Sequence, residues 1–289
     1  MSQGMIILSF EERRIFILPE GPELKHSRDV LRNYIVGQNI VNLSTTTAGR
    51  YKEKKPEGFN DALTDVPLLV ESVDVKGKFM WWTLKGKTKT WYMWSTYGMS
   101  GQWSTKEKDH TCFMIDCGMK KLFFVDPRHF GTIKFTSDPK EHAAKLRSLG
   151  PDVLEDPPLT PELFAERILM KPHRTISEAL MDQRCVSGIG NYLKAECLYR
   201  SGISPIRVVV HLEPAEIEKL WAEVILASRE SYSDQGASIR TYKTVDDSNG
   251  RGQFQFRVYG KKQCPSGHTT RRDETPDGRA SWWCPQCQK

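Results

Sequence analysis

The sequence predicts an α+β protein of two domains, an antiparallel β-sandwich with a flanking helix and then a helical domain that ends in a cysteine-rich ribbon. Three observations support this fold class. Short strand patterns separated by turn signals occupy residues 68–135, a proline-rich segment follows at 150–158, and four helical patterns come after it. The 289 residues are enough for two ordinary domains.

The composition is that of a globular protein that works inside the cell. Hydrophobic residues make up 38% of the chain and charged residues 27%, which excludes a disordered chain. No run approaches about eighteen apolar residues, so we expect neither a membrane span nor a membrane partner. The apolar run at 5–10 is short and is followed by four charged residues, unlike a signal peptide. No feature indicates an obligate oligomer, and we expect an intracellular monomer.

The first expected helix begins at the Gly-Pro-Glu of residues 21–23, because a proline and an acid suit a helix N-terminus. Apolar side chains at helical spacing predict a buried inner face, and Gly37 would end the helix. The inner face consists of Leu24, Leu31, Tyr34 and Ile35.

Strand patterns follow in five short segments, at residues 68–75, 79–84, 90–94, 112–116 and 121–125. The first two flank a Lys-Gly-Lys turn at 76–78, and a Cys-Gly-Met segment lies between the last two. Successive short strands joined by tight turns are typical of an antiparallel sandwich or barrel.

The second half of the chain is predicted to be helical. We interpret residues 150–158 as a domain linker. Helical patterns then occupy residues 161–170, 176–183, 191–201 and 214–232. Residues 235–252 are polar and contain glycines, which predicts a mobile loop, and 253–259 form a short basic β-type segment.

Two glycines and an asparagine lie between the second and third of these helices, in the Val-Ser-Gly-Ile-Gly-Asn of residues 186–191. A turn this tight exposes the amides at the start of the next helix, and such amides can bind a phosphate. Asn191 could cap that helix or bond a phosphate oxygen. Plain packing of a helical hairpin is the more common origin of such a pattern.

The seven cysteines divide into two groups. Four lie in apolar segments and are expected to be buried thiols, namely Cys112, Cys117, Cys185 and Cys197. The other three combine with a histidine into two closely spaced pairs, Cys264 with His268 and Cys284 with Cys287. Zinc prefers four tetrahedral nitrogen or sulfur ligands, so these pairs predict one structural Zn²⁺, against the alternative of thiols placed by chance.

Positive charge is concentrated near the C-terminus. The last fifty residues carry ten Lys or Arg and five Asp or Glu, a net charge of +5 out of +6 for the whole chain. Such a segment suits a polyanionic partner, although a solvated basic tail would look the same. Arg271, Arg272 and Arg279 lie between the two ligand pairs and could contact phosphates. The residues alone thus indicate a zinc-stabilised protein that binds nucleic acid.

Five segments, in family order, resemble the formamidopyrimidine-DNA glycosylase and endonuclease VIII family. They are Leu-Pro-Glu-Gly-Pro-Glu at 18–23, Tyr-Gly-Met-Ser-Gly at 97–101, Asp-Pro-Arg-His-Phe-Gly at 126–131, the stretch 181–196 with its Gly-Ile-Gly-Asn, and the terminal stretch from 258. The resemblance covers roughly residue 19 to the C-terminus. It implies an N-terminal extension (1–18), a catalytic β-sandwich (19–149), a helix–two-turn–helix domain (150–263) and a zinc ribbon (264–289).

The resemblance also implies a bifunctional enzyme of base excision repair, a DNA glycosylase with abasic-site lyase activity that nicks by β,δ-elimination. By this resemblance Pro19 forms a Schiff base with the sugar, and Glu20 moves protons at the ring oxygen and C2′. Lys78 and Arg279 complete the catalytic set by holding the DNA backbone, and Glu23 supports the site. An α-amine titrates near pH ~8, so an N-terminal proline would be partly neutral and nucleophilic at physiological pH.

Further residues are matched to DNA contacts. Met99, Arg128 and Phe130 fall where the family fills the gap left by an everted nucleotide, and Asn191 falls where it holds a phosphate. The implied partner is double-stranded DNA with damaged bases or abasic sites, in the nucleus or another compartment that contains DNA. Lesion choice would depend on pocket shape and on the loop at 238–252. We expect oxidised pyrimidines and further-oxidised guanine products to be preferred over 8-oxoguanine.

One departure from the family bears on the chemistry. Pro19 is preceded by eighteen residues, and Leu18 stands where the family has its removable methionine. An acylated proline nitrogen is an amide, which can neither attack nor form an iminium. Three hypotheses follow. Translation starts at Leu18, which we favour; the leader is cleaved; or proline chemistry has been lost, which leaves Lys78 as a poor substitute or no catalysis at all.

Two other functions stay open at this stage. The chain could be a non-catalytic relative with a blocked nucleophile that recognises damaged DNA. It could also be a zinc-ribbon factor that binds RNA or the ribosome. Base release and strand nicking separate an enzyme from the first, and a preference for RNA over damaged duplex would identify the second.

Overall fold

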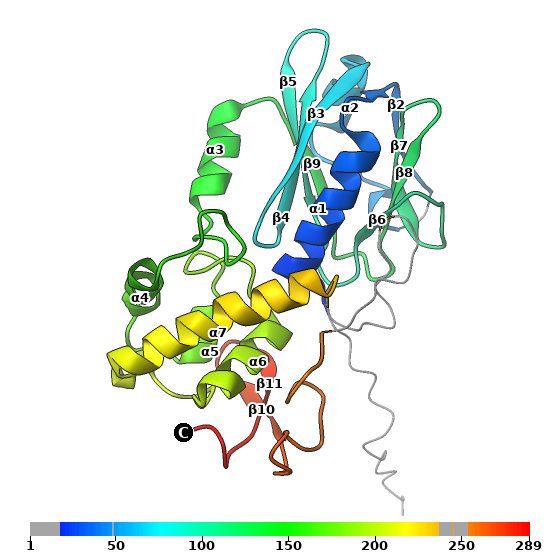
Figure 1. Cartoon of the computed structure of the whole chain (residues 1–289). Helices are drawn as coiled ribbons and strands as arrows, with labels where there is room; N and C mark the ends of the chain where they lie inside the picture. The colour runs from blue at the N-terminus through cyan, green and yellow to red at the C-terminus, as the bar shows by residue number, and fades with distance from the viewer. Residues whose placement is uncertain (1–17, 48, 237–244, 246–253) are drawn as a thin grey trace, which may run out of the picture.

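The computed structural model describes residues 18–47, 49–236, 245 and 254–289, which form two bodies in contact with each other (Figure 1). The first body is a pair of β-sheets, and the second is a group of helices with a small β-hairpin. Helix α1 (Gly21–Ile35) packs on the sheets and also contacts the longest helix of the second body. The predicted fold class is confirmed.

The first body is a sandwich of two antiparallel sheets. One has the strand order β1-β3-β4-β5-β9 and the other the order β2-β7-β8-β6. The strands are β1 (Asn39–Ile40), β2 (Asn42–Thr45), β3 (Leu68–Lys76), β4 (Phe79–Lys85), β5 (Thr90–Thr96), β6 (Gln102–Ser104), β7 (Thr111–Asp116), β8 (Lys121–Val125) and β9 (Thr132–Thr136). The five predicted strand segments are all present. The strands β1, β2 and β6 are too short, at two to four residues, to leave a periodic pattern.

Large aromatic side chains fill the space between the sheets. Trp82, Trp103 and Phe124 are buried, and the Trp103 ring centroid lies 5.2 Å from the centroid of each of the other two. Truncating any of these to alanine would cost about 3–5 kcal/mol. Helix α1 adds Leu24, Leu31 and Ile35 to the same core, as expected, while Tyr34 is only half-buried. This rigid base holds the start of α1 in place.

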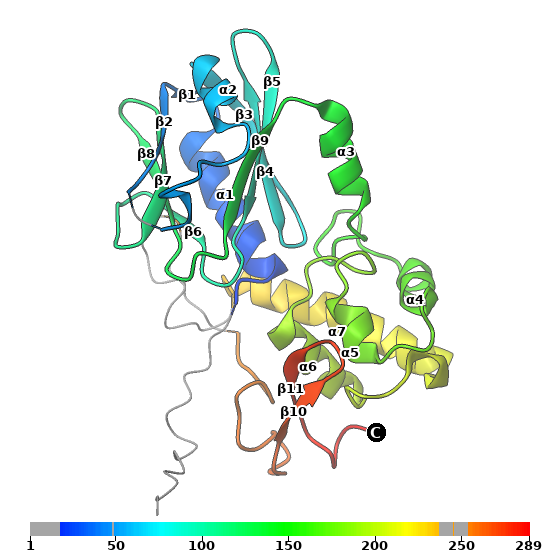
Figure 2. The same cartoon turned by 180° about the vertical axis from the view of Figure 1, so that it is seen from behind.

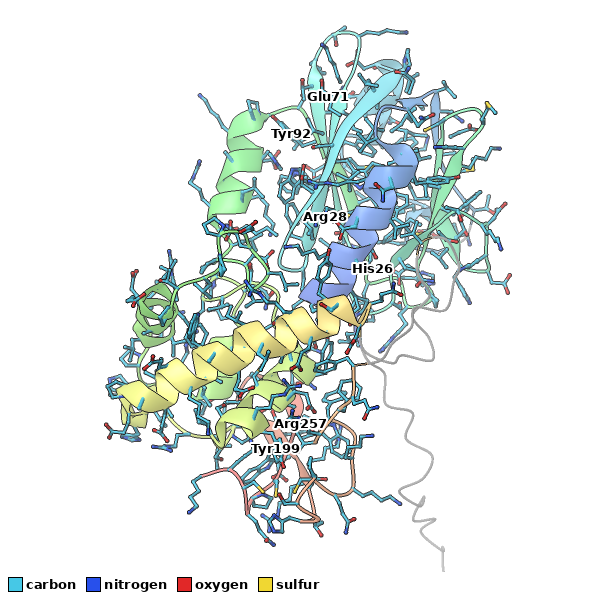
Figure 3. The ribbon with its side chains drawn as sticks, in the orientation of Figure 1. His26, Arg28, Glu71, Tyr92, Tyr199 and Arg257 are labelled. Carbon is cyan, nitrogen blue, oxygen red and sulfur yellow. The ribbon has the colours of Figure 1, made fainter. Side chains whose placement is uncertain are left out.

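The remaining elements of the first body are short. They are η1 (Gly49–Tyr51), α2 (Phe59–Thr64) and α3 (Pro139–Arg147). Asp138 caps α3 by accepting the Lys140 amide. His142 of α3 stacks on Tyr92 at 4.1 Å between ring centroids, and Figure 3 shows Tyr92 on the side of the sheet that faces α3. The helix is thereby fixed to the outer face of the sheet.

The segment predicted to be a linker, residues 150–158, connects the two bodies but is packed between them. Asp152, Val153 and Leu154 are buried. The Asp152 carboxylate accepts the Gly77 amide at 2.8 Å and the Leu154 amide at 2.9 Å. Lys25 of α1 donates to the Leu154 carbonyl. The connection is therefore a fixed joint, held by contacts that its loop-like composition does not reveal.

The second body consists of helices and the C-terminal hairpin, seen from behind in Figure 2. The elements are α4 (Pro161–Leu169), α5 (Ile176–Met181), α6 (Asn191–Ser201), η2 (Val209–His211), α7 (Pro214–Ser233), β10 (Arg271–Thr275) and β11 (Arg279–Trp283). All four predicted helices are present to within two residues. Thr160 and Thr175 cap α4 and α5 by accepting the amides of the third helical residues. None of the helices within the described residues combines the length and apolarity needed to cross a bilayer.

The predicted β-type segment at 253–259 is wrong over the residues that the structure describes, 254–259, because they form no strand. The amides of Arg257, Val258 and Tyr259 donate instead to the buried carboxylate of Glu196 in α6, at 2.8–3.0 Å. A carboxylate that takes up three successive amides leaves none for a β-ladder. Most of the loop predicted at 235–252, including the lesion loop at 238–252, lies outside the described residues.

Candidate active site

A cavity of about 520 Å³ lies where the two bodies meet. Its wall combines the chain start before α1, the β3–β4 turn, the loops after β5 and β8, the start of α6 and the β10–β11 hairpin. Seven of the residues predicted from sequence line it: Pro19, Glu20, Lys78, Met99, Phe130, Asn191 and Arg279. A larger hollow of about 1230 Å³ beside Arg200 and Phe254 is lined by none of the residues predicted to catalyse or contact DNA. The smaller cavity is therefore the candidate site.

Glu20 is bound to the N-terminus of α6. Its carboxylate accepts the amides of Gly190 at 2.7 Å, Tyr192 at 2.8 Å and Leu193 at 3.3 Å. These are the groups that the first turn of a helix leaves unpaired, and they carry the positive end of the helix dipole. The side chain thus spans the two bodies and is only 2% exposed.

The protonation of Glu20 follows from this burial. Removal from water, together with the neighbouring Glu23 carboxylate, raises the pKa of Glu20 to about 8, although Lys78 and the α6 amides act in the opposite direction. Glu20 therefore carries its proton at neutral pH for most of the time. The site holds a carboxylic acid whose pKa lies close to the working pH, as proton transfer in either direction requires.

Glu23 stands behind Glu20 and does not reach the cavity wall. It is fully buried, and it accepts the Glu20 amide at 2.9 Å. The Tyr192 hydroxyl donates to it at 3.0 Å and also contacts the Ser231 hydroxyl at 2.9 Å. Glu23 thereby completes the capping box of α1, as expected of an acid at a helix N-terminus, and it also ties α1 to α6 and α7 beneath the cavity. Its supporting role in the site stays a prediction.

Three glycines allow the two bodies to approach this closely. The Gly21 amide donates to the Gly188 carbonyl at 2.9 Å. A Cβ at Gly190 would lie 2.2 Å from the Glu20 carboxyl carbon, and a Cβ at Gly77 would lie 2.6 Å from the Gly188 nitrogen. These distances leave no room for a side chain. The glycines of the Gly-Ile-Gly turn therefore allow the two domains to come into contact.

Lys78 extends from the β3–β4 turn, where the Asp152 bond to Gly77 fixes the backbone. Burial lowers the pKa of its amine, and the Glu20 carboxylate opposes that shift. Without the family resemblance, the sequence would favour a solvated turn lysine at this position. In the structure the lysine is half-buried in the cavity wall, in electrostatic contact with Glu20 and Arg279.

Met99 and Phe130 lie on two loops that Asp126 holds together. Its buried carboxylate accepts the Ser100 hydroxyl and the Gly131 amide, both at 2.6 Å. Phe130 is 53% exposed, which is unusual for so large an apolar ring. Arg128 is exposed and lies over the Phe130 ring at 5.6 Å, outside the cavity wall. The two loops therefore present an aromatic ring, a thioether and a cation at the cavity rim.

Asn191 and Arg279 bring the C-terminal hairpin to the site. Gly190 is the N-cap of α6 and Asn191 its first residue, so the cap predicted for Asn191 is wrong. The Asn191 amide group donates to the Ala280 carbonyl at 3.0 Å instead. Arg279, the neighbour of Ala280, is exposed and lines the cavity.

The four predicted metal ligands form one cluster. The ligand atoms of Cys264, His268, Cys284 and Cys287 all lie within 4.8 Å of one another. The Cys264 and Cys287 sulfurs are 3.9 Å apart, near the ~3.8 Å edge of a tetrahedron with zinc–sulfur bonds of about 2.3 Å. The remaining predicted thiols are buried at Cys112, Cys185 and Cys197 and half-buried at Cys117.

Sequence analysis missed several residues that organise the site. Asp152, Tyr192 and Ser231 act through contacts over long sequence separations, which no local pattern reveals. Lys194 is different, because it lies in α6 between Leu193 and Ala195, at a position where helical spacing predicts burial. A charged residue in such a place is a signal of a buried partner, and that partner is Asp277.

Comparison with known proteins gives a consistent picture. Residues 18–133 match the formamidopyrimidine-DNA glycosylase N-terminal domain, and residues 149–243 match the formamidopyrimidine-DNA glycosylase H2TH domain. The formamidopyrimidine-DNA glycosylases of Desulfitobacterium hafniense and Geobacillus kaustophilus are each 30% identical, with 94% of this chain and the whole of the relative covered.

Solved structures agree with these relatives. The complex of the Lactococcus lactis protein with DNA that contains an abasic site has a TM-score of 0.81 at 25% identity, over 93% of this chain and 99% of that one. The protein from Thermus thermophilus has a TM-score of 0.81 at 26% identity, over 93% and 98%.

The protonation of Glu20 predicts a pH dependence of stability. The folded protein keeps this proton up to about pH 8, whereas the unfolded chain releases it near its ordinary pKa of 4.5. The contribution of Glu20 to the free energy of unfolding is therefore full below pH 4.5 and declines as the pH rises to about 8. Urea unfolding of the protein and of Glu20→Gln at several pH values should show their difference falling across this window. A difference that stays constant with pH would contradict the assignment.

Proposed function

The chain belongs to the formamidopyrimidine-DNA glycosylase family and is a DNA glycosylase with abasic-site lyase activity, and from this premise we propose that Pro19 is its nucleophile and Glu20 its acid and base. It acts in base excision repair on DNA that carries damaged bases or abasic sites. The observation that carries the proposal is the shared cavity wall, where Pro19 and a protonated Glu20 lie together with Lys78 and Arg279.

The proposed reaction starts from a free secondary amine at Pro19. Its lone pair attacks C1′ of the damaged nucleotide, the glycosidic bond breaks, and the base leaves with the bonding electrons and takes up the proton that the proline nitrogen loses. Glu20 donates its proton to the ring oxygen, the sugar opens, and an iminium forms between the proline nitrogen and C1′. The resulting Glu20 carboxylate then removes a proton from C2′, which expels the 3′ phosphate by β-elimination. A second elimination releases the 5′ phosphate, and water frees the enzyme.

The amine exists only if the Leu18–Pro19 peptide bond is absent in the reactive form. In an acylated proline the nitrogen lone pair is delocalised into the carbonyl. Two observations support a form that begins at Pro19. The family match begins at residue 18, and Pro19 is buried in the cavity wall, where its nitrogen would adjoin Glu20. We propose that residues 1–18 are missing from the active enzyme.

The remaining wall residues are proposed to bind DNA. Lys78 and Arg279 supply cations for the phosphates around the lesion, with Asn191 beside them. Phe130 and Met99, with Arg128 at the rim, would fill the space left by the everted nucleotide. The exposure of Phe130 supports this role. Its ring is 53% exposed, so insertion between bases would remove apolar surface from water, which is favourable.

Borohydride trapping on a duplex with an abasic site tests the nucleophile. Borohydride reduces an iminium to a stable amine, so the chain that begins at Pro19 should become covalently linked to DNA. The 289-residue chain, with its intact mass verified, should not. Glu20→Gln in the Pro19 form is the matched control, with DNA binding retained and trapping slowed by roughly 10²-fold or more.

Two results would count against the proposal. Equal trapping of the verified full-length chain would exclude the Pro19 amine as the nucleophile. If neither form is trapped although both bind the abasic duplex, the chain is a non-catalytic DNA-binding relative.

The lesion range is a separate proposal. The preference for oxidised pyrimidines and further-oxidised guanine products over 8-oxoguanine stays a prediction, whereas the names of the relatives point to formamidopyrimidines. Both kinds of base are smaller or more flexible than an intact purine, and the cavity of about 520 Å³ can admit either. Single-turnover excision of thymine glycol, formamidopyrimidine-guanine and 8-oxoguanine by the Pro19 form decides between them. Fastest release of thymine glycol supports the preference, and fastest release of either formamidopyrimidine-guanine or 8-oxoguanine overturns it.

We also propose that Cys264, His268, Cys284 and Cys287 bind one structural zinc ion. Four protein ligands leave no open position, so the ion would stabilise the ribbon and take no part in the reaction. Elemental analysis should give one zinc per chain, and Cys284→Ser should lower that content and the melting temperature. Because Arg279 is carried by the same ribbon, the variant should also bind abasic duplex more weakly. Full metal content in Cys284→Ser would show that this cysteine is not a ligand.

A further inference from the structure

A second buried charge pair lies beside the site. The Lys194 ammonium and an Asp277 carboxylate oxygen are 2.6 Å apart, and their side chains are 0% and 2% exposed. Replacing such a pair by apolar residues of similar volume is often neutral or stabilising, since the attraction scarcely offsets the loss of hydration. Stability alone therefore gives a weak reason for charges at this place.

Lys194 projects from the first turn of α6, the same turn that binds Glu20. Its amide donates to the Gly190 carbonyl at 2.9 Å, and the Gly190 amide donates to Glu20. Glu20, Asp277 and Arg279 all act electrostatically on the Lys194 ammonium. The lysine is enclosed by protein, so it is not available to contact DNA itself.

Asp277 organises the turn between β10 and β11. One carboxylate oxygen takes Lys194, while the other accepts the Thr275 hydroxyl and, at 3.4 Å, the Arg279 amide. Gly278 has φ +72°, as a tight turn at this position requires. Arg279 therefore directly follows a turn, and the Asp277 carboxylate, which is bound by Lys194, sets the shape of that turn.

We infer that the Lys194–Asp277 pair is a positioning device that fixes Arg279 at the cavity, at a set distance from Glu20. Arg279 is bracketed by two contacts from α6: Lys194 holds Asp277 on one side, and Asn191 holds the Ala280 carbonyl on the other. Since α6 also binds Glu20, a single helical turn carries both the proton-transfer group and the backbone of the phosphate-binding arginine. This inference rests on the DNA-binding role proposed for Arg279.

The test uses binding to a duplex with a tetrahydrofuran abasic-site analogue, which needs no chemistry. Arg279→Ala should weaken binding about tenfold, and the slope of log affinity against log salt should fall by about one unit. Lys194→Met should reproduce both changes. In the Arg279→Ala background, Lys194→Met should change affinity by less than about twofold, because the residue through which it acts is already gone.

Two further variants separate positioning from folding. Lys194→Met with Asp277→Leu leaves no orphan charge, so its melting temperature should stay near that of the parent protein, yet its affinity should still fall about tenfold. Arg207→Met is the matched control, because it breaks an ion pair with Glu216 elsewhere in the same domain and should leave affinity unchanged. Zinc content should be the same in all variants.

The outcomes are decisive in both directions. Additive losses in the Lys194→Met/Arg279→Ala double variant, wild-type affinity of Lys194→Met/Asp277→Leu, or wild-type affinity of Arg279→Ala would each overturn the inference. Failure of the proposed nucleophile is distinguishable, because it would abolish borohydride trapping of the Pro19 form and leave these binding differences in place.

Discussion

The structure depends on one interaction, the carboxylate of Glu20 against the first turn of α6. Glu20 belongs to the first body and α6 to the second. The three hydrogen bonds from backbone amides to the Glu20 carboxylate therefore fix the position of one body relative to the other. Both partners need the contact. The helix end has unpaired amides that must be satisfied away from water, and the carboxylate is buried by the same approach. The close contacts at Gly21, Gly77 and Gly190 follow from the need to bring them together.

Helix α6 is unusual in burying ionisable groups along its length. Glu196 takes three amides of the segment before the ribbon, and Figure 3 shows Tyr199 and Arg257 where this helix meets that segment. Lys194 forms an ion pair with Asp277, and the amides at the helix N-terminus bind the Glu20 carboxylate. Buried charges contribute little net stability, but each demands a partner in one place. The polar groups of α6 therefore specify where the two bodies and the ribbon lie, while apolar packing supplies most of the stability.

The sequence was sufficient for most of the fold, because periodicity and caps act locally. It placed α1 and the four helices of the second body, the five main strands and the metal cluster, whose spacing alone dictates proximity. It was insufficient where a distant group decides the local structure. Asn191 looks like a cap, but the Glu20 carboxylate occupies the helix end, and the segment after 253 looks like a strand, but Glu196 takes its amides. The packed joint at Asp152 escaped prediction for the same reason.

The same arrangement links the C-terminal ribbon to the cavity. A metal ion bound by Cys264, His268, Cys284 and Cys287 would hold the ends of the β10–β11 hairpin together, but metal ligands alone do not determine how its turn faces the cavity. That orientation comes from α6, through Asn191 and Lys194. Glu20 in turn holds α6 at the cavity. Glu20, the proposed acid and base, and Arg279, the proposed phosphate-binding residue, are therefore positioned by one helical turn, so a shift of that turn would displace both together.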